Sequence, residues 1–117
     1  MRFDKETVDG ISLLKLQERK LDTSNSGLLK GELTDYVTRE KIECLILDLQ
    51  SVESCDSSGL SVLLVAKKLI DDNNGVLCVI PSSKIKHLIE ITKLDRALSF
   101  SDSLPDAIQT AKQIKRF

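Results

Sequence analysis

Apolar residues change their spacing several times along the chain, and these changes separate strand-like from helix-like segments. "RFDKETVDGISLLKLQ" (residues 2–17) predicts two short strands joined by Asp9-Gly10, a dipeptide that tolerates the positive φ angles of a tight hairpin turn. "ECLILDLQ" (43–50) and "VLCVIP" (76–81) are almost continuously apolar, which is typical of strands buried on both faces of a parallel sheet. "ALSFS" (97–101) predicts a weaker last strand.

Helical spacing of apolar residues fills the segments between these strands. The first helix is expected over about 26–40 with "NS" as its cap, and the second is "GLSVLLVAKKLI", ended by the turn "DDNNG". "SSKIKHLIEITK" predicts a third helix and "DSLPDAIQTAKQIKRF" a fourth, with Asp and Pro near its start. The residues expected to face inward from the first, third and fourth helices are Leu28, Leu29, Leu33, Tyr36 and Val37; Ile85, Leu88, Ile89 and Thr92; and Leu104, Ala107, Ile108, Ala111 and Ile114.

The predicted element order is ββαβαβαβα, which indicates an α/β fold in one domain over residues 1–117. Alternation of strands and helices favours parallel strands joined by right-handed crossovers, with helices packed against the sheet. The opening hairpin adds an antiparallel strand at or near one edge, so the sheet is expected to be mixed but mostly parallel. In such sheets the working surface usually lies at the carboxyl ends of the strands.

Composition narrows the class of protein. Apolar residues make up 41% and charged residues 30% of the 117 residues, the formal net charge is −1, and aromatic residues contribute only 3%. The core must therefore be built from Leu, Ile and Val. Lys112, Lys115 and Arg116 complement the end of a C-terminal helix, which argues against direct nucleic-acid binding. No signal peptide or membrane span is visible, so we expect a cytoplasmic protein without membrane contact.

Three cysteines, Cys44, Cys55 and Cys78, are widely spaced and contain no CxxC pair, which favours reduced thiols over a disulfide framework. Cys44 and Cys78 lie in apolar runs and are expected in the core. Cys55 is expected to be partly exposed near a helix N-terminus, a position that favours the thiolate. The sequence shows no constellation of residues that would bind a metal, since the consecutive "DDNN" lacks the alternate spacing of a calcium loop.

The stretch Asp56-Ser57-Ser58-Gly59 lies where a buried strand segment gives way to the second helix. Asp or Ser there can cap the helix, and because one residue suffices, at least one hydroxyl is left available. A serine hydrolase would need a G-x-S-x-G elbow and a base, but the only histidine, His87, is expected on the surface of the third helix. Neither a phosphate-binding glycine loop nor the acidic pair that would accompany a phospho-acceptor Asp48 is present.

"LILDLQSVESCDSSGLSVLLVAKKL", followed by "GVLCVIPSSKIKHLIEITKLDRAL", resembles the STAS domain of bacterial anti-sigma factor antagonists over nearly the whole chain. The resemblance implies that Ser57 is phosphorylated by a partner that is both an anti-sigma factor and a serine kinase, and that Ser58 and Gly59 shape the helix start. The family's G-x-L-D is matched by "RKLD", in which Arg19 replaces the glycine and Asp22 is retained.

From this resemblance we expect a phosphorylation-controlled switch that binds the kinase when Ser57 is unmodified and releases it when Ser57 carries phosphate. A serine phosphatase would reset it. ATP and magnesium would belong to the kinase, so this chain is expected to be no enzyme and to hold no cofactor. The expected partner-binding residues are Asp22, Thr23, Ser24, Asp56, Ser57, Ser58 and Gly59.

Three alternatives stay open at this point. The chain could be a STAS interaction module in a scaffold or a transport-associated complex, in which Ser57 only caps the helix. It could be a small hydrolase that uses Ser57, although the sequence offers no credible base. Asp22, finally, could simply cap a nearby turn.

Overall fold

The predicted strands and helices form in the expected order, and two short strands are added to them. The computed structural model describes residues 1–96 and 98–115, and the side chains among these up to residue 113. Its elements are β1 (Phe3–Val8), β2 (Ile11–Leu16), β3 (Lys20–Leu21), α1 (Ser26–Glu40), β4 (Cys44–Leu49), β5 (Ser54–Cys55), α2 (Ser57–Asp72), β6 (Val76–Pro81), α3 (Ser83–Thr92), a 3-10 turn (Leu94–Arg96), β7 (Ser99–Phe100) and α4 (Leu104–Lys115).

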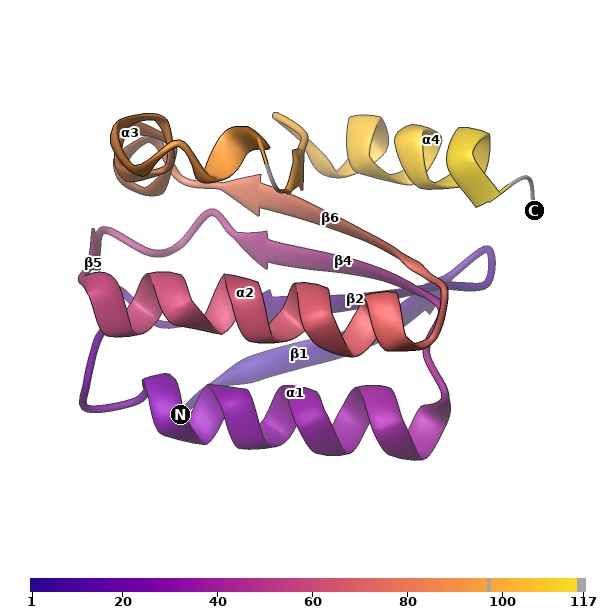
Figure 1. Ribbon diagram of the computed structural model, residues 1–117, viewed down its shortest axis with the longest axis horizontal. Coiled ribbons are helices and arrows are strands. Elements are labelled where there is room, and N and C mark those ends of the chain that lie inside the picture. The colour runs from indigo at the N-terminus through magenta and orange to yellow at the C-terminus, as the bar shows by residue number, and fades with distance from the viewer. Residues whose placement is uncertain (97, 116–117) are drawn as a thin grey trace.

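The main sheet has five strands in the order β1-β2-β4-β6-β7. β1 lies at the edge and pairs antiparallel with β2, whereas the pairs β2–β4, β4–β6 and β6–β7 are parallel. The hairpin turns at Asp9 and Gly10, whose φ angles are 52° and 79°. Helices cover both faces of this sheet (Figure 1). The expected mixed, mostly parallel α/β sheet with an antiparallel edge strand is therefore confirmed.

β4 is the central strand, and all six of its residues are buried. Leu45, Leu47 and Leu49 face a core cluster shared with α1, α2 and α3, while Cys44 and Ile46 face a smaller cluster shared with α4. Period-two alternation of a strand places successive side chains on opposite faces, so a strand covered on both sides has to be apolar throughout. Truncating a fully buried leucine such as Leu47 to alanine is expected to cost about 2–5 kcal/mol.

Some side chains do not face the core as the spacing predicts. Leu28 is 61% exposed, because the buried stripe of α1 runs through Leu29, Leu33 and Val37 and leaves Leu28 one residue out of phase. Thr92 is also exposed, and its hydroxyl donates to the Leu88 carbonyl at 2.7 Å. Four others are only half-buried, namely Tyr36, Leu88, Leu104 and Ile108.

The end of α2 confirms the turn that "DDNNG" predicts. Asn74 has a φ of 55°, and the Asn73 side-chain amide donates to the Ile42 carbonyl at 2.9 Å. A Cβ on Gly75 would lie 2.0 Å from the Glu43 carbonyl oxygen, so only glycine allows this close approach. At the end of the molecule opposite the starts of α1 and α2, this turn therefore packs against the backbone just before β4.

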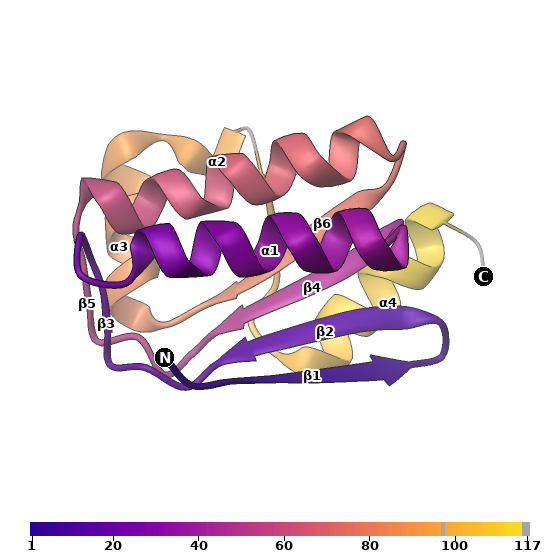
Figure 2. The same cartoon turned by 90° about the horizontal axis from the view of Figure 1, so that it is seen from below.

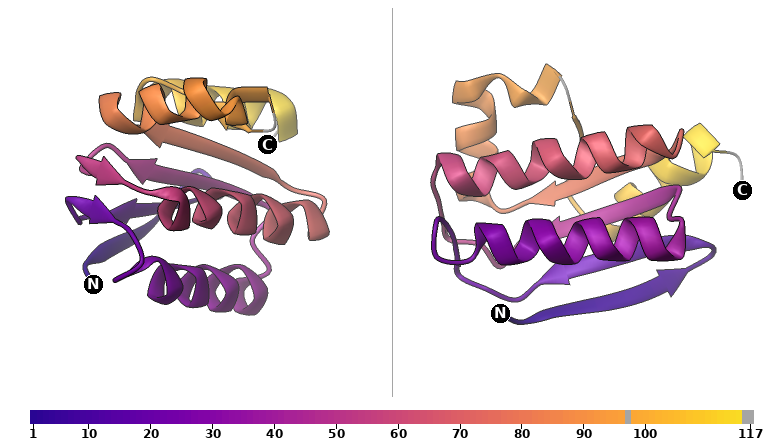
Figure 3. Two further views of the ribbon diagram at one scale, coloured as in Figure 1. Left: turned by 60° about the vertical axis from the view of Figure 1, so that its left-hand side comes forward. Right: turned by 60° about the horizontal axis from the view of Figure 1, so that its bottom comes forward.

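α4 packs on the sheet face opposite α1 and α2 (Figures 1 and 3). Ala107 and Ala111 are buried, and Lys112 pairs with Asp9 of the hairpin at 2.7 Å. The predictions for Ala97, for the inward side chain of Ile114 and for the cations Lys115 and Arg116 lie outside the described residues and side chains. None of the helices among the described residues is both long enough and apolar enough to cross a bilayer.

Candidate functional site

Two short strands that the sequence pattern does not predict bring the candidate segments together. β3 and β5 form a separate parallel pair in which Lys20 is opposite Ser54 and Leu21 is opposite Cys55. The Asp56 N–H also donates to the Leu21 carbonyl at 3.3 Å. Figure 2 shows this pair at the end of the molecule where α1 and α2 begin. Because Asp22 follows β3 directly and Asp56 follows β5 directly, the two segments lie next to each other.

The start of α2, residues 56–59, is capped by a carboxylate. Asp56 is the N-cap residue, with φ −108° and ψ −171°, and its Oδ1 accepts a hydrogen bond from the Gly59 N–H at 3.0 Å. Ser57 is the first helical residue and is exposed, whereas Ser58 is half-buried. The capping role that the sequence allowed to either residue type thus belongs to Asp56. No described residue is hydrogen-bonded to the Ser57 hydroxyl.

Gly59 lets the start of α2 lie directly against β3. A Cβ at this position would be 2.2 Å from the Leu21 carbonyl oxygen and 2.6 Å from the Cys55 sulfur. Both distances are far below normal contact, so a larger residue would force the helix and the strand apart. Glycine here is needed for close packing.

Asp22 organises the turn that leads into α1, which we call the Asp22 turn (residues 22–25). Its Oδ1 accepts hydrogen bonds from the Ser24 N–H at 2.9 Å and from the Ser24 hydroxyl at 2.5 Å. These two bonds, together with the nearby charge of Lys20, hold the pKa of the Asp22 carboxyl below its usual value. Thr23 and Ser24 are exposed. Asp22 therefore caps a turn, which is the structural role that the sequence left open for it. The same turn exposes two further polar residues beside the start of α2.

Cys55 departs from its expectation. Burial, followed by the negative charges of Asp56 and Asp22, raises the pKa of this thiol to about 11, so the thiolate is disfavoured. Both carboxylates therefore lie close enough to this sulfur to act on its charge. Cys44 and Cys78 are buried free thiols, as predicted.

Two other candidate residues lie outside this arrangement. His87 is exposed on α3, as expected, and no base is hydrogen-bonded to Ser57 among the described residues. Asp48 is buried at the end of β4, where its Oδ1 accepts from the Gln50 N–H at 3.0 Å. Neither residue contributes to a nucleophilic site at Ser57.

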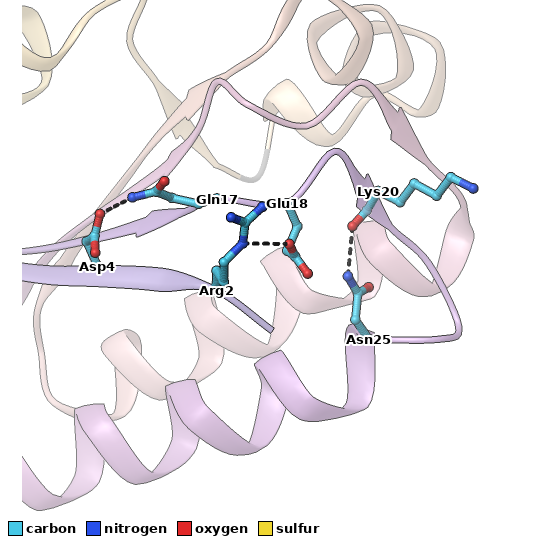
Figure 4. Close-up of polar contacts among 6 residues, drawn as sticks. All are labelled: Arg2, Asp4, Gln17, Glu18, Lys20 and Asn25. Atoms are coloured by element: carbon cyan, nitrogen blue, oxygen red, sulfur yellow. Dashed lines mark hydrogen bonds and ion pairs between the residues drawn. The ribbon is translucent and has the colours of Figure 1, made fainter.

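Asn25 was expected to cap α1, but its side chain makes no capping hydrogen bond. Instead its carboxamide bonds to the backbone of Lys20 and Asp22. Sequence reasoning missed this role because Asn before a helix is normally read as a cap. The segment before it is also fastened to the start of the chain, where Arg2 approaches Glu18 at 3.9 Å and Gln17 bonds to Asp4 (Figure 4).

Comparison with known proteins gives matches that include both candidate segments. The family model described as "STAS domain" matches residues 2–107. A Thermotoga maritima protein named "Putative anti-sigma factor antagonist" is 26% identical over 112 residues, covering 95% of this chain and 98% of that protein. The "Anti-sigma F factor antagonist" of Paenibacillus polymyxa is 25% identical over 109 residues, covering 92% of both chains. A crystal structure from Thermotoga maritima superposes with a TM-score of 0.82 at 27% identity over 94% of each chain.

Proposed function

The chain belongs to the STAS domain family, and we propose that it is an anti-sigma factor antagonist whose binding to an anti-sigma factor with serine kinase activity is switched off by phosphorylation of Ser57. Two relatives named as anti-sigma factor antagonists, matched over most of their length, support the class of protein. The observation that carries the choice of residue is the carboxylate cap of α2, because Asp56 binds the Gly59 N–H and leaves the exposed Ser57 hydroxyl available.

Ser57 is the better acceptor of the two adjacent serines. It is exposed at the first position of α2, so a kinase can reach its hydroxyl without unwinding the helix, whereas Ser58 is half-buried. The kinase supplies ATP, magnesium and the catalytic base, and this chain supplies only the accepting oxygen. In this proposal the protein is a substrate and a ligand of the kinase. It acts in the cytoplasm, and a serine phosphatase returns it to the binding state.

The modified domain stays folded in this proposal. A phosphoserine adds about −1.5 to −2 charges at neutral pH. At the first turn of α2 this charge meets backbone N–H groups without helical partners and the positive end of the helix dipole. These favourable contacts offset the repulsion from the neighbouring Asp56 carboxylate.

The partner, in contrast, has to accommodate the phosphate in a complex formed around a neutral hydroxyl. The proposed surface consists of the Asp22 turn and the start of α2, which already carry the carboxylates of Asp22 and Asp56. Bringing a third anion into contact without new cations requires stripping water from it, and burial of an uncompensated charge costs at least several kcal/mol. A loss of about 3 kcal/mol already weakens binding on the order of a hundredfold. The anti-sigma factor kinase, a single protein in this proposal, is then released and can inhibit its sigma factor.

Calorimetric titration of the purified kinase tests this proposal. Ser57→Ala should bind as tightly as the unmodified protein, while Ser57→Asp and the phosphorylated protein should bind about a hundredfold more weakly. Circular dichroism checks that all forms are folded. Tight binding by the phosphorylated protein would contradict the electrostatic mechanism, and an unfolded phosphoprotein would replace it by an order-to-disorder switch.

The surface is tested separately with Asp22→Ala. This variant should lose at least about tenfold in affinity, or about 1.4 kcal/mol, with only a small fall in the melting temperature, because the two bonds that its carboxylate accepts both come from Ser24 in the same turn. Equal binding would remove Asp22 from the interface. If wild-type protein is never phosphorylated in an extract of its own cells supplied with ATP, the domain is instead an interaction module in which the Ser57 hydroxyl is not modified.

A further inference from the structure

One carboxamide ties the Asp22 turn to the strand before it, in addition to the backbone N–H groups of Asn25 and Ser26, which donate to the Asp22 carbonyl at 3.2 and 2.8 Å. The Asn25 Nδ2 donates a hydrogen bond to the Lys20 carbonyl at 2.8 Å, and its Oδ1 accepts one from the Asp22 N–H at 3.0 Å. Figure 4 shows the first of these bonds, with the Asn25 side chain pointing from the start of α1 toward Lys20. The side chain is thus used at both its donor and its acceptor by the strand and the turn before it.

These two bonds bracket Leu21, the residue that fastens β3 to the rest of the site. Leu21 is fully buried, pairs with Cys55 and places its carbonyl against Gly59. Anchoring the residues on both sides of Leu21 fixes the path by which the chain leaves β3. Asn25 therefore connects the first turn of α1 to the strand pair, and through it to the start of α2.

We propose that Asn25 is a positioning residue for the partner-binding surface, holding the Asp22 carboxylate and the Ser57 hydroxyl in one fixed arrangement before the partner arrives. The role rests on the proposed function, because it presumes a partner that contacts both segments. A surface that is already ordered binds more tightly, because its residues lose little conformational entropy when the complex forms. Asn suits this position because its planar group combines donors with an acceptor, whereas Asp has no donor and Ala has neither.

The internal order of the Asp22 turn gives a readout that needs no partner. The bonds from Ser24 to the Asp22 carboxylate lower the pKa of Asp22, so this pKa reports on the geometry of the turn. In Asn25→Ala the turn should loosen, and the Asp22 pKa, followed by NMR of the side-chain carboxyl carbon, should rise toward its ordinary value. Lys20, whose charge also lowers this pKa, is unchanged in the variant.

Asn73 provides a matched control, because it lies at the C-terminal end of α2, away from the proposed surface. It is half-buried like Asn25, and its Nδ2 likewise donates to a backbone carbonyl, that of Ile42, at 2.9 Å. Asn73→Ala should lower the melting temperature about as much as Asn25→Ala does, but it should leave the Asp22 pKa unchanged. A rise in the Asp22 pKa in both variants would indicate general loosening and would overturn the positioning role.

The second measurement is calorimetric affinity for the purified anti-sigma factor kinase. Asn25→Ala should bind about tenfold more weakly than wild type, whereas Asn73→Ala should bind as wild type does. If the wild-type protein binds the kinase and Asn25→Ala binds it equally well, the inference is overturned and the proposed function stays intact. The same holds if the Asp22 pKa is unchanged in Asn25→Ala. Absence of binding by the wild-type protein overturns the proposed function, and the partner role of Asn25 with it.

Discussion

Two helices of this domain have a serine pair at their start, within two residues of the preceding strand, and they use the pair differently. At the start of α3, the Ser82 hydroxyl accepts a hydrogen bond from the Ile85 N–H at 3.2 Å and so serves as the cap. At the start of α2, Asp56 makes the equivalent bond to the Gly59 N–H at 3.0 Å. A carboxylate that caps a helix relieves the following hydroxyl of a structural task. Only at α2 is a serine pair left without a capping duty.

The third helical position differs as well. In α3 it is Ile85, whose side chain is fully buried in the main core and so holds the start of the helix against it. In α2 it is Gly59, against which the Leu21 carbonyl packs. The start of α3 is thus held by an apolar side chain, and the start of α2 by a strand from an earlier part of the chain. The second arrangement places another loop, the Asp22 turn, beside an available hydroxyl.

The largest expected effect is on phosphorylation by the cognate kinase. Ser57 and Ser83 are both exposed at the first position of a helix, but only Ser57 has the Asp22 turn beside it. We expect one phosphate on Ser57 and none on Ser83 or Ser58, measured by mass spectrometry of the two peptides. Ser57→Ala should abolish labelling and Ser83→Ala should preserve it. Phosphate on both helix starts would mean that exposure alone selects the residue.

The reactivity of Cys55 tests the close packing before the α2 start. A thiol pKa of about 11, against an ordinary 9.0, lowers the thiolate fraction at pH 8 by about a hundredfold. Alkylation of Cys55 by iodoacetamide, followed by peptide mass spectrometry, should therefore be slower than in the urea-unfolded protein by at least about that factor. Asp56→Asn removes one of the charges that raise the pKa and should speed the reaction. Equal rates in folded and unfolded protein would contradict the packing.

Glycine substitutions give a third contrast, now in stability. Gly59→Ala should lower the free energy of unfolding by about 1–3 kcal/mol, because its Cβ would overlap the Leu21 carbonyl. The matched control is Gly31→Ala in α1, where a Cβ would meet nothing within 4 Å. That change should stabilise the protein by about 0.5–1 kcal/mol through helix propensity. Urea denaturation measures both, and a neutral Gly59→Ala would show that α2 and β3 can separate without cost.

The smallest expected effect concerns the two caps themselves. Asp56→Ala and Ser82→Ala should each lower the free energy of unfolding by about 1 kcal/mol, since each leaves one N–H at a helix start without its side-chain partner. Asp56→Ser should recover most of that loss. Thermal melts of the three variants compare them, and a cost for Ser82→Ala alone would mean that Asp56 does not act as the α2 cap.

Elements with long periodic or continuous apolar patterns could be predicted from the sequence, as β4 and the four helices illustrate. β3 and β5 could not, because a two-residue strand has no period and its pairing depends on residues far away in the chain. Leu28 was misplaced because a run of adjacent leucines does not reveal which one lies on the buried stripe. The role of Asn25 could not be predicted for a related reason. Its hydrogen bonds go to backbone groups, and every residue has these, so the sequence does not indicate which ones Asn25 contacts. At α2 the pattern indicated a cap and a spare hydroxyl, while the choice between Asp56 and the serines needed the geometry.

The pairing of Lys20 with Ser54 also bears on when this surface comes into existence as the protein folds. All of α1 and β4 lies between the two strands, so their pairing closes a long loop and has to wait for the intervening elements to collapse. A nascent or misfolded chain contains Asp56 and Ser57 in sequence but lacks the neighbouring turn. Under the proposed function, we expect a partner that contacts both segments to bind such chains weakly, and we expect a short peptide spanning residues 51–65 to compete poorly with the intact domain. If the proposed partner contacts both segments, its binding therefore also depends on the protein having finished folding.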